Sequence, residues 1–253
     1  MARYKLTLEY DGTDFAGWQR QADGITTVQS VLEQAITRFC GEQVILHVAG
    51  RTDAGVHAAG QVAHVDLVRA DVPPETMRDA VNFHVRPHRV AVLAAELVDE
   101  NFHARFSATV RAYRYTIINR RAPPVLDAAR VWHIQKPLDA ATMQLAANQL
   151  LGQHDFSTFR AQHCQAPTPI KTLDAMTVVR DGEKLIIFAR SRSFLYHQVR
   201  NMVGTLYMVG QGQWSQEDFA AAFAACDRTR GGPTAPAQGL CFLGPTYSKD
   251  AIK

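Results

Sequence analysis

The chain has 253 residues, of which 47% are hydrophobic and 20% are charged. This length and composition indicate an ordinary soluble globular protein with one large core or two modest ones. The four cysteines have no CxxC spacing, which argues against a zinc ribbon or a disulfide framework and favours a reduced, cytoplasmic setting. No apolar run approaches the roughly 18 residues of a membrane span, and the first residues lack an apolar signal core. We therefore expect no membrane association.

The first half of the chain predicts a βαββαβ order. Alternating apolar residues from Tyr4 to Tyr10 predict a strand that ends at Asp11-Gly12. Thr26 and Gln29 have capping-box spacing, and the apolar stripe that follows predicts a helix ending at Gly41. The remaining predicted elements of this half are strands at 43–49 and 61–67, a helix near 75–84 that opens after Pro73, and a strand at 89–97.

The second half has a similar but weaker pattern. A long strand is predicted at 107–119, followed by a helix whose apolar stripe runs from Met143 to Leu151. Two more strands meet at Asp181-Gly182, a dipeptide typical of hairpins. A helix with Leu195 to Leu206 on one face, a helix opened by Ser215 and Asp218, and a strand near 240–243 complete the chain.

These elements predict an α+β protein made of two similar halves, each with antiparallel sheet flanked by helices, in the manner of a duplicated RRM-like unit. We place the halves at 1–103 and 104–253.

The net charge of +3 is compatible with a polyanionic partner, although many metabolic enzymes have the same balance. Arginines cluster in two stretches and aromatic residues lie among them, as expected for a surface that holds phosphates and stacks on bases. Ordinary strand faces with solvated arginines would give the same pattern. The arginines are Arg105, Arg111, Arg114, Arg120, Arg121, Arg190, Arg192 and Arg200, and the aromatic residues are Phe102, Phe106, Tyr113, Tyr115, Phe194 and Tyr196.

The segment AGRTDAGVHA, residues 49–58, places one carboxylate, Asp53, on a glycine-containing loop. A carboxylate does chemistry in an acid/base pair, as a metal ligand, or alone as a nucleophile or base. The nearest preceding acid, Glu42, lies across a predicted strand, so a glycosidase-type pair is unsupported. Asp53, His57 and His64 could form a metal set, but Gly55 interrupts the helical spacing and Arg51 would repel a cation. Asp53 could also simply cap a turn or pair with Arg51.

The segment from Arg51 to His57, RTDAGVH, resembles the catalytic motif of the TruA-type tRNA pseudouridine synthases, in which the aspartate is essential. Further similarity to this family extends over nearly the whole chain. The chain departs from the family at Cys241-Phe242, where a tyrosine and an aliphatic residue are usual after Gly-Leu. In the family this position belongs to the apolar floor of the uridine pocket. The other similar segments are YDGT at 10–13, GWQRQ at 17–21, NFHARFSA at 101–108, RAYRY at 111–115 and VRNMVG at 199–204.

The resemblance implies that uracil is detached from C1′ of its ribose, turned, and rejoined through C5, with neither a metal nor a redox cofactor. Asp53 would start this reaction, either by attacking C1′ or by removing a sugar proton to give a glycal. The glycines of the loop would allow close backbone approach. The uridine would have to be flipped out of the stack, at a cost of roughly a few kcal/mol. Arg51 would fill the space it leaves or hold its phosphate.

Other residues take their expected roles from the same resemblance. Tyr113 matches the uracil-stacking tyrosine of the family, whereas Tyr115, on the same strand face, is the better candidate for a core aromatic. Arg200 matches an arginine that pairs with the catalytic aspartate and would keep it ionised. Arg20, Arg105 and Arg114 are candidates for RNA contacts, and His57 and His64 are expected to be structural.

The hypothesis is therefore a cytoplasmic, homodimeric tRNA pseudouridine synthase with its active cleft between the two halves. Its targets would be uridines 38, 39 and 40 of the anticodon stem-loop. Two alternatives are a non-catalytic RNA-binding module, which would have no use for Asp53, and a metal-dependent hydrolase using Asp53, His57 and His64.

Overall fold

The computed structural model describes residues 1–68 and 72–248, and their contacts divide the chain into two compact units. The first unit comprises Met1–Arg111 and the chain from Cys241 onward, and the second comprises Ala112–Leu240. The units therefore begin and end elsewhere than the predicted halves, because the last strand returns to the first unit. The division into 1–103 and 104–253 as functional domains stays a prediction.

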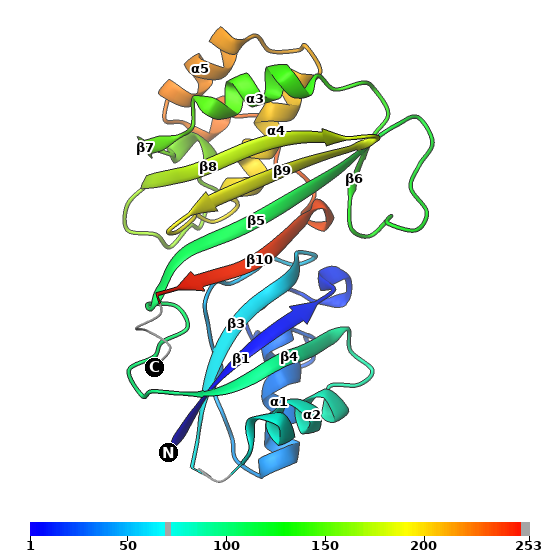
Figure 1. Cartoon of the computed structure of the whole chain (residues 1–253). Helices are drawn as coiled ribbons and strands as arrows, with labels where there is room; N and C mark the ends of the chain where they lie inside the picture. The colour runs from blue at the N-terminus through cyan, green and yellow to red at the C-terminus, as the bar shows by residue number, and fades with distance from the viewer. Residues whose placement is uncertain (69–71, 249–253) are drawn as a thin grey trace. The chain divides into compact units, whose positions relative to one another are not determined.

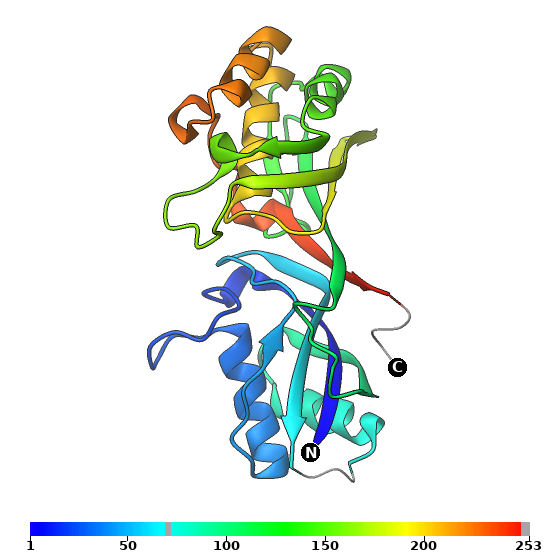
Figure 2. The same cartoon turned by 90° about the vertical axis from the view of Figure 1, so that its left-hand side faces the viewer.

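The first unit has the predicted βαββαβ order, with a short 3-10 helix, Gly12–Asp14, after its first strand. β1 lies between β4 and β3 and is antiparallel to both. The short strand β2 is also antiparallel to β3, whereas β10 pairs with β3 in parallel. Helices α1 and α2 pack together on one face of this sheet (Figures 1 and 2). The elements are β1 (Ala2–Tyr10), α1 (Val28–Cys40), β2 (His47–Val48), β3 (His57–Leu67), α2 (Pro74–His84), β4 (Val90–Val98) and β10 (Leu240–Tyr247).

The alternating residues Tyr4, Leu6 and Leu8 of β1 are completely buried. Leu32 and Ile36, on the apolar stripe of α1, are also completely buried. The predicted helix start is wrong by one residue, because Thr27 rather than Thr26 is the N-cap and forms a capping box with Ser30. Thr27 has the extended backbone of an N-cap, and its hydroxyl accepts a hydrogen bond from the Ser30 N–H. Gly41 ends the helix in the left-handed conformation, at φ 79°.

The second unit has the strand order β5-β9-β8-β7, with β6 added in parallel to β5. β8 lies between β7 and β9 and is antiparallel to both, and the turn between β8 and β9 is Gly182-Glu183. Helices α3, α4 and α5 pack on one another, and α3 contacts β8 (Figure 1). The elements are β5 (Ala108–Asn119), β6 (Trp132–Ile134), α3 (Ala140–Asn148), β7 (Gly152–Asp155), β8 (Ile170–Asp181), β9 (Lys184–Ser191), α4 (Gln198–Gly210) and α5 (Gln216–Ala224), with 3-10 helices at Ser157–Phe159, Arg228–Arg230 and Ala237–Gly239.

The prediction of an α+β fold with mostly antiparallel sheet flanked by helices is confirmed. The errors lie in the lengths of elements and in two short strands, β6 and β7, that were not predicted. The strand expected at 43–49 is reduced to two residues, and the helix expected to reach Leu151 ends at Asn148 because Gly152, at φ 98°, begins β7. Over the part of the chain that the structure describes, every helix is too short or too polar to cross a membrane.

Candidate functional site

Asp53 lies on the loop between β2 and β3, in the first unit. Its side chain is half-buried, while Arg51 is exposed and Thr52 is buried. The Val56 N–H donates to the Asp53 carbonyl at 3.1 Å, and Gly55 takes the left-handed conformation, at φ 77°, that this turn requires. Asp53 is therefore on a closed turn whose backbone is ordered.

The segment after β1 supports this loop through its backbone. The Trp18 N–H donates to the Thr52 carbonyl at 3.0 Å, and the Gly55 N–H donates to the Phe15 carbonyl at 3.4 Å. Gly17 has φ 96°, and a Cβ there would lie 2.9 Å from the Thr52 carbonyl oxygen. Only glycine satisfies both the backbone angle and the close approach. The GWQRQ segment and the RTDAGVH segment, which are distant in sequence, are thus one structural element.

Buried polar side chains also hold the loop through hydrogen bonds. The Tyr10 hydroxyl lies 2.7 Å from Thr52 Oγ1, and Gln61 Nε2 donates to the Gly50 carbonyl at 2.8 Å and to the Tyr10 hydroxyl at 3.3 Å. Tyr10 and Gln61 are almost completely buried. Burial raises the pKa of Tyr10, so its phenol stays neutral and serves as a hydrogen-bonding strut.

The start of the loop is anchored by Arg111 and Phe242. Arg111 Nε and Nη2 both donate to the Ala49 carbonyl, at 3.1 and 2.9 Å. The fully buried Phe242 ring lies 4.0 Å from the position that a Cβ on Gly50 would occupy. Phe242, one of the two residues at which the chain departs from the family pattern, therefore packs beneath the root of the Asp53 loop.

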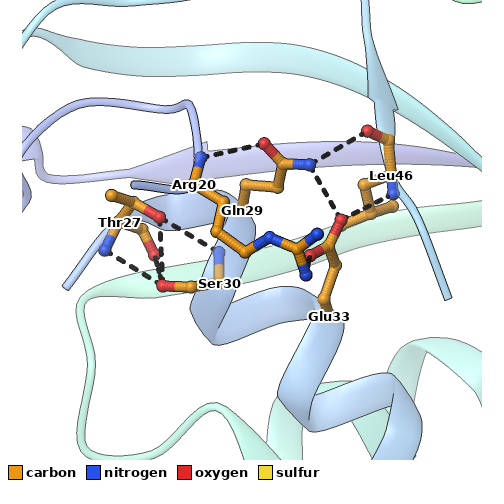
Figure 3. A network of polar contacts seen from close by, with 6 residues as sticks. All are labelled: Arg20, Thr27, Gln29, Ser30, Glu33 and Leu46. Atoms are coloured by element: carbon orange, nitrogen blue, oxygen red, sulfur yellow. Dashed lines mark hydrogen bonds and ion pairs between the residues drawn. The ribbon is translucent and has the colours of Figure 1, made fainter. Parts of the chain in front are cut away.

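Arg20, a candidate for RNA contacts, belongs to a network on α1 (Figure 3). Arg20 Nη1 lies 3.0 Å from Oε2 of Glu33, whose side chain is only 6% exposed, while the Arg20 side chain is 55% exposed. Oε1 of Glu33 accepts from Gln29 Nε2 at 2.8 Å and from the Leu46 N–H at 2.9 Å. Arg20 thus neutralises a buried carboxylate, whatever it contributes to ligand binding.

We expect Arg20→Gln to lower the free energy of unfolding by about 1–2 kcal/mol, because it leaves the Glu33 carboxylate buried with weaker compensation. Adding Glu33→Gln should recover most of that loss, since the neutral amide no longer needs a cation. Urea unfolding of the two single variants and the double variant measures the coupling. Simple additivity of the two substitutions would show that the ion pair has no structural role.

The two histidines of the metal-site hypothesis are buried and hydrogen-bonded to different backbone segments. His57 Nδ1 accepts from the Gly12 N–H at 3.0 Å, and His64 Nδ1 accepts from the Ala104 N–H at 3.1 Å. A search of the described residues finds no cluster of three or more His, Cys, Asp or Glu arranged to hold a metal ion. The contacts of both histidines are those of structural residues.

His64 should make the protein sensitive to acid. Burial and the nearby His103, Arg3 and His47 lower the pKa of His64 to about 4. The unfolded value is about 6.5, so the native state binds fewer protons, and stability present above pH 6.5 is lost as the pH falls towards 4. Because the Asn side chain can still accept from Ala104, His64→Asn should flatten this dependence.

Denaturant unfolding between pH 7 and pH 4 measures the effect. His163→Asn is the matched control, since His163 is exposed and its left-handed backbone, at φ 68°, suits asparagine. An unchanged pH dependence in His64→Asn, or an equal flattening in His163→Asn, would contradict the assignment.

Tyr113 and Arg200 lie in the second unit, Tyr113 on β5 and Arg200 on α4. The Tyr113 ring is half-buried and meets Phe194 edge-on, with ring centroids 5.3 Å apart. Tyr115 is completely buried, and its hydroxyl donates to the Pro236 carbonyl at 2.8 Å. Tyr115 is therefore a core residue, and Tyr113 is the tyrosine of this strand that keeps an accessible surface.

Arg200 is half-buried and held by its own unit. Its Nε donates to the Ala235 carbonyl at 2.8 Å, and Nη1 lies 3.3 Å from His197 Nε2. His197 begins α4 in the left-handed conformation, at φ 60°, which a residue with a Cβ rarely adopts. Arg200 was predicted from the resemblance alone, and it is a positioned side chain, not a freely solvated one.

The structure thus brings Asp53 and Arg51 together on one loop of the first unit, and it places Tyr113 and Arg200 in the second. Arg105, in the first unit, and Arg114, in the second, are exposed. Sequence reasoning did not single out the residues that hold the loop. The Gly17-Trp18 pair was the one available sign that this segment supports the loop. Nothing in the local sequence indicated the role of Gln61 or the contacts of Arg111.

Comparisons with protein families and with individual known proteins point to the same family. A family model described as tRNA pseudouridine synthase matches residues 7–107 and 146–248. Three relatives, each named tRNA pseudouridine synthase A, match nearly the whole chain. They come from Paramagnetospirillum magneticum (61% identical, covering 100% of this chain and 98% of the relative), Rhodospirillum rubrum (56%, covering 96% and 87%) and Xanthobacter autotrophicus (58%, covering 98% and 100%).

Proposed function

Because the chain belongs to the tRNA pseudouridine synthase family, we propose that it converts uridines 38, 39 and 40 of the tRNA anticodon stem-loop to pseudouridine, with Asp53 as its catalytic residue. The observation that carries the assignment of Asp53 is the loop itself. One carboxylate stands on a turn that is fixed by two backbone hydrogen bonds to a separate segment: the Thr52 carbonyl accepts from the Trp18 N–H, and the Gly55 N–H donates to the Phe15 carbonyl. Such fixation is what a reacting group needs to reach one sugar carbon reproducibly.

The chemistry asks little more of the protein than this acid. The N1–C1′ bond breaks, uracil turns, a C5–C1′ bond forms, C5 loses its proton and N1 gains one, so no atom is added or lost. The Asp53 carboxylate starts the reaction at the ribose, either by attacking C1′ or by taking a sugar proton. Neither route draws on a cofactor.

The exposed Arg51 lies two residues before Asp53 on the same loop, so its cation would meet the RNA backbone at the reacting nucleotide. We assign it to the phosphate of the flipped uridine or to the space that the uridine leaves, since the base must leave its stack before C1′ can be reached.

In the second unit, the half-buried ring of Tyr113 is the platform for the uracil and Arg200 is the partner of the Asp53 carboxylate. Both assignments are proposals, supported within that unit by the edge-on contact of Tyr113 with Phe194 and by the backbone carbonyl that holds Arg200.

The substrate also needs contacts away from the reacting base. Arg105 and Arg114 are exposed and have no acidic side chain within ion-pair distance among the described residues, so they are assigned to tRNA phosphates. Arg20 is a weaker candidate because of its ion pair with Glu33. A homodimer that works on tRNA in the cytoplasm completes the proposal.

We expect Asp53→Asn to abolish pseudouridine formation while the affinity for tRNA changes by less than about twofold. The amide keeps the volume of the side chain but removes the nucleophile or base. Release of tritium from tRNA labelled at C5 of uridine, together with filter binding, measures both properties. Asp14→Asn is the matched control, because Asp14 is exposed in the same unit and the change in charge is the same.

The outcomes separate the candidate functions. Substantial turnover by purified Asp53→Asn would refute the role of Asp53, and a wild-type protein that binds tRNA but forms no pseudouridine would favour the binding module. The hydrolase hypothesis has little support, since its two histidines bind separate backbone segments.

A second prediction concerns the Tyr113 hydroxyl. We expect Tyr113→Phe to bind tRNA almost normally, because the ring that stacks on uracil is kept, yet to release little finished product. The hydroxyl beside the base would take the C5 proton after the new carbon-carbon bond forms. Rapid-quench analysis should show bond formation without tritium release. Near-normal turnover would reduce Tyr113 to a platform, and weakened binding equal to that of Tyr113→Leu would exclude both roles.

A further inference from the structure

Phe106 is a large aromatic side chain that is 73% exposed in the first unit. It lies on the turn between β4 and β5. Its ring centroid is 4.3 Å from that of His103, which in turn lies 4.7 Å from that of His64. His47, on β2, stacks on His64 at 4.9 Å with an interplanar angle of 20°. Phe106 is thus the exposed end of a series of packed rings that reaches the buried His64.

The backbone beneath Phe106 is well ordered. His103 Nδ1 accepts from the N–H groups of Arg105 and Phe106, at 3.1 and 3.3 Å. The Ser107 N–H donates to the His103 carbonyl at 2.9 Å, and the His103 N–H donates to Ser107 Oγ at 3.0 Å. The exposed ring is therefore presented in one place at little further entropic cost, which favours binding of a flat partner.

A cation accompanies the ring. The Arg105 guanidinium carbon lies 5.7 Å from the centre of the Phe106 ring, and Arg105 is itself exposed. This pair combines an aromatic face with a positive charge, as surfaces that bind single-stranded nucleic acid do. Arg105 and His103 lie against the ring, and such polar neighbours suit a nucleic acid better than a protein partner, which would bury a continuous apolar area.

The turn is joined directly to the root of the Asp53 loop. Arg111 Nη2 donates to the Arg105 carbonyl at 2.7 Å and to the Ala49 carbonyl at 2.9 Å. Phe102 and Ala104 from the turn also share a buried cluster with Ala49. An RNA whose uridine reaches Asp53 would continue past this surface.

We propose that Phe106 is a stacking platform for an unpaired base of the tRNA other than the reacting uridine, with Arg105 bound to a neighbouring phosphate. The proposal rests on the proposed function, because it takes its ligand from it. The structure singles Phe106 out from its neighbours in the sequence. Phe102 is 1% exposed and Tyr115 is completely buried, so neither can offer a face to a base.

The test measures tRNA affinity in the Asp53→Asn background, where substrate cannot turn over. Adding Phe106→Leu should weaken binding about five- to tenfold, since leucine keeps an apolar side chain but has no π face. Adding Phe106→Trp should bind as tightly as the parent or more tightly. Phe83→Leu is the matched control and should leave affinity unchanged. Phe83 is 68% exposed in the same unit and meets a histidine, His84, at a centroid distance of 5.1 Å.

Salt titration distinguishes stacking from charge. Phe106→Leu should lower affinity at every salt concentration without changing the slope of log affinity against log salt. Arg105→Gln should reduce that slope by about 0.7–0.9. Parent-like affinity of Phe106→Leu, an equal loss in Phe83→Leu, or a slope changed by Phe106→Leu would overturn the platform. Those results leave the proposed function standing, whereas turnover by Asp53→Asn alone would refute the role of Asp53 without involving Phe106.

Discussion

Among the contacts that position Asp53, the hydrogen bond from the Trp18 N–H to the Thr52 carbonyl joins the segment after β1 to the loop. It forms because Gly17 has no Cβ where the Thr52 carbonyl approaches, and because its φ of 96° turns the chain towards the loop. A side chain at position 17 would push the loop away and carry the carboxylate with it. Gly17, which is distant from Asp53 in sequence, therefore helps to determine where the Asp53 carboxylate lies.

Helix α1 holds the other side of that contact. The N–H groups of Val28 and Gln29 donate to the carbonyls of Gly17 and Trp18. The Ser30 N–H donates to Thr27 Oγ1, and the Thr27 N–H donates to Ser30 Oγ. All four N–H groups that a helix leaves open at its start are thus satisfied. The Arg20–Glu33 ion pair joins the end of the same segment to the next turn of the helix (Figure 3). Hydrogen bonds and one ion pair thus connect α1 to the segment at 17–20, and that segment is bonded to the loop that carries Asp53.

The opposite end of the loop is held by a different part of the unit. Arg111 joins Ala49 to the turn that carries Arg105 and Phe106, and the Phe242 ring packs under Gly50. Arg111 therefore links the root of the Asp53 loop to the backbone of the turn that carries Phe106.

The sequence by itself determined the order of strands and helices in the first unit, because alternation and the 3.6-residue stripe report burial directly. It also identified Asp53 as an acid in need of an explanation. It missed the helix cap by one residue, since Thr26 and Thr27 are chemically equivalent there and only the backbone angles choose between them. Only the tertiary structure decided that Phe106 is exposed while Phe102 is buried. The ion pair between Arg20 and the buried carboxylate of Glu33 was likewise visible only in the tertiary structure. These choices depend on contacts between segments far apart in the chain, and local composition carries no record of them.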